Sequence, residues 1–186
     1  MIKNKIQVFG EIKPRGMYLL IMELSKEIKI DFGKFKKGKE FRLEPGHYLY
    51  LGSAMKNLPS RLIRHTLRSE KRPAHEIQKE SVKSMIDLGF IIKEPDLSEK
   101  KLHWHIDYLL DNSHISIAQI NMFMTNVSLE AKMGNFLKNS LNVEQISTGL
   151  GASDHYGNSH ILKILDLNWF TQNEGENLKK LFDELI

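Results

Sequence analysis

Cysteine is absent from this 186-residue sequence. Its absence excludes disulfide bonds, zinc ribbons, thiolate-held metal clusters and a cysteine nucleophile. Long apolar runs are lacking as well: the longest stretches, such as residues 17–22, fall far short of the ~20 residues that a helix needs to cross a bilayer. The first ten residues contain no apolar signal region. We therefore expect a cytoplasmic protein with no membrane partner.

A strong excess of charge of either sign is also lacking. The sequence has 27 Lys and Arg against 23 Asp and Glu, so its net charge is only +4. Such a charge mildly favours a polyanionic partner over an acidic one. The basic residues gather in residues 28–42 and 56–72, whereas the last helical segment is net acidic. We therefore place the polyanion-binding surface near these two basic segments.

The pattern of apolar residues and turn signals favours a single domain spanning residues 1–186. A chain of this length can bury about 70% of its unfolded surface. The order of elements indicates an α/β (α+β) fold, with a small mixed or antiparallel sheet flanked by helices. The pattern predicts strands at 6–9, 16–24, 47–53, 115–124 and 161–165, short strands or a hairpin within 28–41, and helices at 58–69, 74–88, 128–138 and 173–185.

Two tyrosines fall on separate predicted strands. Tyr18 belongs to the strand that opens with Gly16-Met17-Tyr18, and Tyr50 to the run Tyr48-Leu49-Tyr50-Leu51-Gly52-Ser53-Ala54. Strands favour tyrosine in any case, so each residue taken alone fits core or edge packing as well as a functional role.

Basic residues cluster on the next predicted helix. Arg61, His65 and Arg68 are spaced i, i+4 and i+7 and so share one helix face, with Arg64 beside them. One interpretation is a solvated basic face. The other is a phosphate clamp, because the guanidinium fork matches phosphate oxygens.

A compact histidine-rich run offers a different chemistry. In His103-Trp104-His105-Ile106-Asp107, alternate residues would line one strand face as metal ligands, together with His155 or His160. A short helix would instead scatter them. The glycine-rich segment 149–154 lacks the lysine of a phosphate-binding loop and fits a tight turn. Glu130 stands in a first helical turn, where the helix dipole alone favours a carboxylate.

The order of these features resembles the GIY-YIG nuclease family. Gly16-Met17-Tyr18, Tyr50-Leu51-Gly52, Arg61 with His65, and Glu130 follow one another as the motifs of that family do. The chain is more closely similar to a compact branch of stand-alone prokaryotic proteins, sometimes fused to DNA glycosylase-type domains. The matching stretches run from about residue 16 to residue 164 and comprise Pro45 to Ala54, Arg61 to His65, His103 to Leu110, Gly149 to Asp154, and Ser159-His160.

The resemblance implies phosphodiester hydrolysis with one loosely bound divalent cation, Mg²⁺ or Mn²⁺, held by Glu130. It implies that Tyr18 or Tyr50 activates or positions the attacking water and that Arg61 stabilises charge in the transition state. His65 would orient a partner or relay a proton. Lys56, Arg64 and Arg68 would bind the phosphates of nucleic acid, with DNA expected as the substrate and a DNA-repair protein as a possible partner.

Two alternatives stay open at this stage. The same fold can serve as a nucleic-acid-binding module without efficient catalysis, or the histidine-rich run can serve a different metal-dependent hydrolase.

The sequence also departs from the family pattern. The two tyrosine motifs lie more than thirty residues apart. Residues 71–101 stand where the branch has a short connector, which predicts an inserted helix, and extra strands are expected at the N-terminus. His155 and Gly157 occupy positions where relatives often have cysteine.

Overall fold

The computed structural model describes residues 4–70, 72–93, 100–152 and 158–186. Its strands are β1 (Ile6–Phe9), β2 (Gly16–Leu24), β3 (Ile28–Asp31), β4 (Glu40–Leu43), β5 (Gly46–Ala54), β6 (Ile115–Met124), β7 (Val143–Gln145) and β8 (Ile161–Ile164). Its α-helices are α1 (Leu58–His65), α2 (Gln78–Asp87), α3 (His105–Leu110), α4 (Glu130–Lys138), α5 (Leu167–Trp169) and α6 (Gly175–Leu185). A 3₁₀ turn, η1 (Phe35–Lys37), and a π-helical segment, η2 (Phe170–Glu174), complete the described elements.

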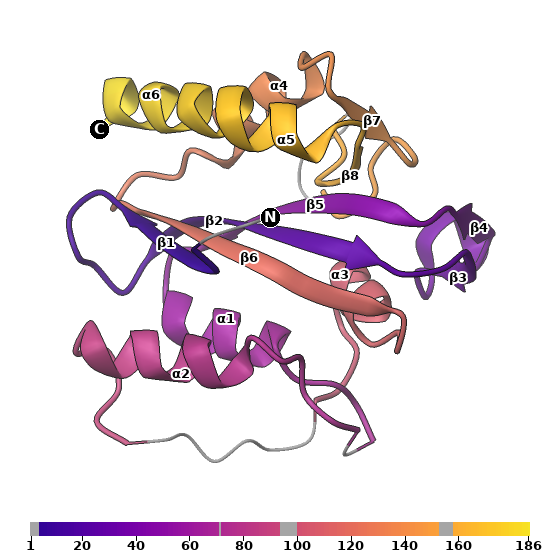
Figure 1. Ribbon diagram of the computed structural model, residues 1–186, viewed down its shortest axis with the longest axis horizontal. Coiled ribbons are helices and arrows are strands. Elements are labelled where there is room, and N and C mark those ends of the chain that lie inside the picture. Colours follow the sequence, from indigo (N-terminus) through magenta and orange to yellow (C-terminus); the bar gives the residue numbers. More distant parts are fainter. Residues whose placement is uncertain (1–3, 71, 94–99, 153–157) are drawn as a thin grey trace.

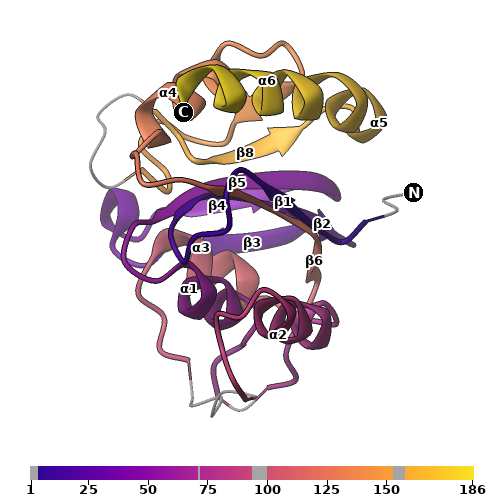
Figure 2. The same ribbon diagram turned by 90° about the vertical axis from the view of Figure 1, so that its left-hand side faces the viewer.

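A six-stranded sheet in the order β1-β6-β2-β5-β8-β7 forms the middle layer of the molecule. β1 is parallel to β6, and the other pairs are antiparallel, so the predicted mixed sheet is confirmed. Helices α1, α2 and α3 cover one face, and α4, α5 and α6 cover the other (Figures 1 and 2). The predicted hairpin is a separate two-stranded ribbon of β3 and β4.

Strand β2 lies in the middle of the sheet and is buried on both faces. Tyr18, Leu20 and Met22 pack into the core under α1, α2 and α3. The alternate residues, such as Leu19 and Ile21, pack into the core under α4 and α6. This alternation follows from the two-residue period of a strand.

Several element boundaries differ from the prediction. α1 ends at His65, four residues earlier than expected, because Thr66 caps it and the Ser69 amide and hydroxyl bind the Asp111 carboxylate instead. α4 begins at Glu130, two residues later than predicted, with Leu129 at its N-cap position. The predicted inserted helix is α2, which lies beside α1 (Figure 1). None of the helices in the described part of the chain is long and apolar enough to span a membrane.

Candidate active site

A cavity of about 540 Å³ opens at one end of β5, and its lining includes residues of α1 from one helical layer and of α4 from the other. β5 pairs with β8 only from His47 to Tyr50, so its last residues extend beyond that neighbour. The cavity therefore receives side chains from both faces of the sheet. Its lining comprises Tyr50, Ser53, Arg61, His103, Trp104, His105, Glu130, Gly151, Ala152 and His160.

Three of the residues implied by the family resemblance line this cavity. Tyr50 comes from β5, Arg61 from α1 and Glu130 from the start of α4. α1 is set in place by Asn57, whose side chain accepts a hydrogen bond from the Ser60 amide at 2.9 Å. This cap fixes Arg61 in the first turn of the helix.

Tyr18 and His65 lie behind the cavity wall, not on it. Both side chains are fully buried. The Tyr18 hydroxyl and His65 Nε2 share a hydrogen bond of 2.8 Å. The Tyr50 ring lies 6.0 Å from each of these two rings, so the three form one packed cluster. Tyr50 is thus the tyrosine that faces the cavity, with Tyr18 and His65 supporting it.

The glycine of the second tyrosine motif makes room for the first tyrosine. Gly52 is the cross-strand neighbour of Tyr18. A Cβ atom at position 52 would lie only 2.3 Å from the Tyr18 ring and 2.4 Å from its hydroxyl. Only glycine therefore allows the Tyr18 ring to cross over β5 and reach His65.

Burial sets the protonation states of this cluster. It raises the pKa of Tyr18 well above its ordinary value and raises the pKa of Tyr50 to about 12. It lowers the pKa of His65 to about 3, although the nearby Asp107 carboxylate raises it in part. Both phenols are therefore protonated and the imidazole is neutral near pH 7. In this state the cluster can donate and accept hydrogen bonds, but neither phenol is a ready base.

Glu130 presents its carboxylate to the cavity from the other helical layer. Its Oε2 accepts a hydrogen bond from the Ser53 hydroxyl, and its Oε1 lies 3.1 Å from His160 Nδ1. The side chain keeps 24% of its surface exposed. A single carboxylate beside an open space suits a hard divalent cation that retains most of its waters. Among the described residues, no cluster of three or more acidic or histidine side chains could hold a metal ion by itself.

The position of Arg61 depends on a stack with Trp104. The Arg61 guanidinium lies 3.8 Å from the centre of the Trp104 ring, and the Arg64 guanidinium lies 4.4 Å from it. Stacking of this kind holds a guanidinium in place by cation–π attraction. Trp104 comes directly before α3, so the start of α3 determines where Arg61 can point.

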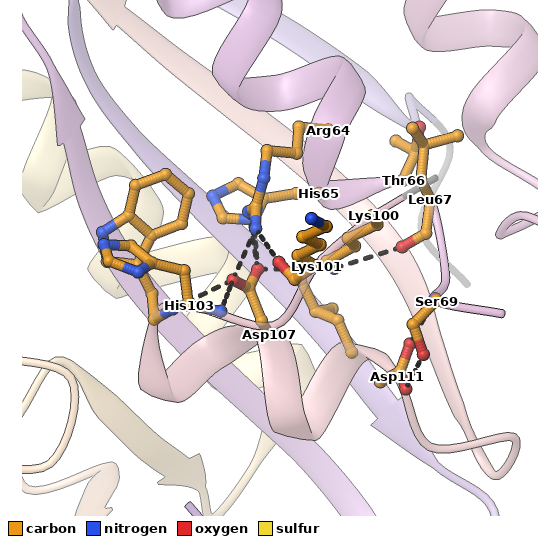
Figure 3. A network of polar contacts seen from close by, with 12 residues as sticks. Arg64, His65, Thr66, Leu67, Ser69, Lys100, Lys101, His103, Asp107 and Asp111 are labelled. Atoms are coloured by element: carbon orange, nitrogen blue, oxygen red, sulfur yellow. Dashed lines mark hydrogen bonds and ion pairs between the residues drawn. The ribbon is translucent and has the colours of Figure 1, made fainter. Parts of the chain in front are cut away.

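Asp107 ties the start of α3 to α1 (Figure 3). Its carboxylate accepts two hydrogen bonds of 2.8 Å from Arg64 and one of 2.9 Å from each of the backbone amides of His103 and Trp104. Lys100 Nζ lies 3.4 Å away. Burial alone would raise the pKa of Asp107, but Arg64 and Lys100 lower it to about 2. The ionised carboxylate thus anchors Trp104, and through it Arg61.

The remaining residues expected to bind phosphate have separate environments. Lys56 and Arg64 line a second hollow of about 320 Å³, which shares Ser53 and Arg61 with the main cavity. Arg64 also donates to Asp107, so its guanidinium has an intramolecular role as well. Arg68 lines neither hollow, and it donates to the backbone oxygens of Pro73 and Ile115.

The histidine-rich run does not form the strand face that would make it a metal site. α3 begins at His105, so the three side chains are scattered. Asp107 is engaged by Arg64, and His105 Nδ1 accepts a hydrogen bond from the Gly151 amide at 3.1 Å. Of the two arrangements considered for His103, His105 and Asp107, the structure therefore has the short helix and not the strand face. His155 and Gly157 lie outside the described residues.

Two further cavity residues, Ser53 and Trp104, had no predicted role. Both belong to sequence stretches that the resemblance singled out, Gly52-Ser53-Ala54 and His103-Trp104-His105. Their presence in these stretches is the signal that could have identified them.

Comparison with known proteins yields one family. A model of the family described as "Domain of unknown function DUF123" matches residues 17–183, which is most of the chain. Neither the curated proteins nor the solved structures contain a match. The matched region includes every residue of the main cavity, and the chain belongs to the DUF123 family.

Proposed function

We propose that this protein is a divalent-metal-dependent nuclease that hydrolyses phosphodiester bonds in DNA, as the resemblance to GIY-YIG nucleases implies. The observation that carries the proposal is the convergence of Tyr50, Arg61 and Glu130 on one cavity from three different elements. Glu130 is distant in the sequence from both Tyr50 and Arg61, so its meeting with them is not a consequence of local structure.

Each of these side chains has a role that its environment permits. Arg61 donates hydrogen bonds to the non-bridging phosphate oxygens and stabilises the negative charge that grows on them in the transition state. The protonated Tyr50 hydroxyl hydrogen-bonds the attacking water and orients it. Tyr18 and His65 hold the Tyr50 ring from behind. A divalent cation held by Glu130 would polarise the phosphate, stabilise the leaving oxygen and lower the pKa of nearby hydroxyl groups.

The adjoining hollow supports nucleic acid as the substrate. Lys56, Arg61 and Arg64 line it, so a positively charged surface continues from the main cavity. A strand whose scissile phosphate occupies the main cavity would place a neighbouring phosphate there. Contacts of this kind are electrostatic and independent of base sequence.

An assay of magnesium-dependent nicking tests the proposal. Branched, single-stranded and duplex DNA are each incubated with the wild-type protein and with Glu130→Gln and Arg61→Met. Both variants should lose at least about a hundredfold in rate, which is the typical effect of removing one transition-state contact.

Two surface changes serve as matched controls in this assay. Glu144→Gln alters an exposed glutamate on β7, and Lys83→Met alters an exposed lysine on α2 that pairs with Asp87. Both control proteins should cleave at the wild-type rate. Cleavage that survives in Glu130→Gln and Arg61→Met would refute the assignment of this site.

A second candidate function is nucleic-acid binding without efficient catalysis. It is favoured by the high pKa values of Tyr18 and Tyr50, which leave the site without a ready base near pH 7. Binding without cleavage in the presence of Mg²⁺ and Mn²⁺ would support this candidate. Whether the protein is a nuclease or only a binding module, its affinity for nucleic acid should fall steeply with salt concentration, because phosphate contacts release counterions. The cytoplasmic location and a DNA-repair partner stay predictions.

A further inference from the structure

His160 is a buried histidine whose ring has no hydrogen bond within the described structure. Its side chain is 1% exposed, and neither Nδ1 nor Nε2 has a hydrogen-bond partner among the described residues. Buried polar atoms in native proteins are satisfied in about nine cases out of ten. An unpaired imidazole at the wall of a cavity therefore calls for a ligand that the described residues do not supply.

The neighbour of His160 is the carboxylate of Glu130. Nδ1 lies 3.1 Å from Oε1, yet the two atoms are not aligned for a hydrogen bond. Two adjacent ligands, each about 2.1 Å from one six-coordinate ion, are separated by about 3.0 Å. The observed spacing is thus that of two atoms that share a metal ion.

Further contacts hold this pair in place. The Ser53 hydroxyl donates to Glu130 Oε2, which leaves Oε1 on the side of His160. An outer hydrogen bond of this kind orients a ligating carboxylate. Gly134 gives the imidazole its space, because a Cβ atom there would lie 3.3 Å from Nε2.

We infer that His160 is a second, nitrogen ligand beside Glu130, and that the site selects a transition ion such as Mn²⁺ over Mg²⁺. The inference rests on the metal site of the proposed function and deepens it. Oxygen ligands suit both Mg²⁺ and Mn²⁺, whereas an imidazole ligand favours the first-row transition ions, a series in which Mn²⁺ is the weakest binder. One carboxylate and one imidazole leave about four positions for water and substrate oxygens in a six-coordinate ion.

Electron spin-echo spectroscopy of the Mn²⁺-loaded protein tests the nitrogen ligand directly, with no nucleic acid present. The wild-type protein should show ¹⁴N modulation from a coordinated imidazole. His160→Gln should lose it, and His103→Gln, which alters an exposed histidine of the same cavity, should retain it. Absence of ¹⁴N modulation in the wild-type protein, or its persistence in His160→Gln, would overturn the inference.

Calorimetric titration tests the selectivity. The wild-type protein should bind Mn²⁺ at least about tenfold more tightly than Mg²⁺. His160→Gln should weaken Mn²⁺ binding by about tenfold or more while changing Mg²⁺ binding by less than about threefold. Equal affinity of the wild-type protein for the two ions, or an unchanged Mn²⁺ affinity in His160→Gln, would contradict the inference.

These measurements separate the inference from the proposed function. Nitrogen coordination without DNA cleavage would support the ligand assignment and reject the nuclease. If the protein cleaves DNA with Mg²⁺ but its bound Mn²⁺ shows no ¹⁴N modulation, the nuclease is supported and the assignment of His160 as a ligand is rejected. His160→Asn is the second variant if circular dichroism shows that His160→Gln is unfolded, and the wild-type spectrum decides the outcome without any variant.

Discussion

Two tyrosines on β5, two residues apart, differ in what their hydroxyl groups face. Tyr50 lines the main cavity, whereas the Tyr48 hydroxyl donates to the Glu44 backbone oxygen at 2.7 Å, away from it. If Tyr50 positions the attacking water, Tyr50→Phe should reduce the cleavage rate by at least about tenfold, because a positioned hydrogen bond is lost. The measurement is the single-turnover rate of DNA cleavage at saturating protein.

Tyr48→Phe is the matched control for this prediction, because it removes a hydroxyl from the same strand and the same core. It should leave the cleavage rate within about twofold of wild type, since its hydroxyl contacts no cavity residue. Equal rates for Tyr50→Phe and the wild-type protein would show that Tyr50 only packs.

Gly52 offers a stability test of the contact between the two tyrosine motifs. Gly52→Ala would force a Cβ atom to within 2.3 Å of the Tyr18 ring, so the ring or β5 must move. Overpacking of a core costs about 1–3 kcal/mol, and we expect the free energy of unfolding in urea to fall by this amount. The Tyr18 to His65 hydrogen bond should be lost as well.

Gly175→Ala is the control glycine change. Gly175 has a helical backbone, and its nearest neighbour would be 3.8 Å from the new Cβ. Alanine should therefore raise the free energy of unfolding by up to about 1 kcal/mol. Destabilisation by both changes to the same extent would mean that the Tyr18 contact is not the cause.

At the scale of elements, Asp107 is the connection between α1 and α3. Asp107→Asn would leave the buried Lys100 and the Arg64 guanidinium without their counter-charge. Removing one partner of a buried ion pair costs about 3–5 kcal/mol, so a loss of this size in the free energy of unfolding is expected in urea. The Arg61 and Trp104 stack should loosen in consequence, which a change in tryptophan fluorescence would report.

The pair Lys83 and Asp87 on α2 supplies the comparison. It is an i, i+4 ion pair with both side chains more than half exposed. Asp87→Asn should therefore change the free energy of unfolding by no more than about 0.5 kcal/mol. An equally small effect of Asp107→Asn would show that the buried carboxylate does not hold the two helices together.

The elements themselves were partly predictable. The bounds of β1, β2 and β6 match the prediction, because turn signals flank the first two and apolar residues fill all three. α1 was predicted too long because the leucine spacing continues to Leu67, while Ser69 is captured by Asp111, a residue distant in the sequence. The pattern left the run from His103 to Asp107 open between a strand and a short helix, although an acidic residue three positions after Trp104 is typical of a helix start.

At the scale of the whole molecule, the sequence motifs named residues that meet in space, but they did not show how deeply each one is buried. The motif order named Tyr50, Arg61 and Glu130, and these line one cavity. The motif order could not show that Tyr50 lines the cavity while Tyr18 and His65 are fully buried, because burial depends on which helix covers which face of the sheet. The position of His160 against Glu130 likewise depends on how β8 meets β5.

Two of the buried histidines, His65 and His75, should govern the acid stability of the whole domain. Burial lowers the pKa of both His65 and His75 from 6.5 to about 3. As the pH falls below 6.5, the unfolded chain takes up protons that the folded chain does not, so the free energy of unfolding must decrease. Each histidine contributes a slope of about 1.4 kcal/mol per pH unit once the pH is well below 6.5. Asp107, with its pKa of about 2, adds to this loss only below about pH 4.

Urea denaturation between pH 7 and about pH 4 measures this slope, and His75→Gln isolates one of the two contributions. In the folded protein, His75 Nε2 lies 3.0 Å from the Leu110 backbone oxygen, Nδ1 lies 3.4 Å from Arg68, and a glutamine amide can still donate to the Leu110 oxygen. His75→Gln should therefore halve the slope. A free energy of unfolding that stays constant over this range in the wild-type protein would mean that both imidazoles take up protons without unfolding, and hence that neither is held neutral by the core.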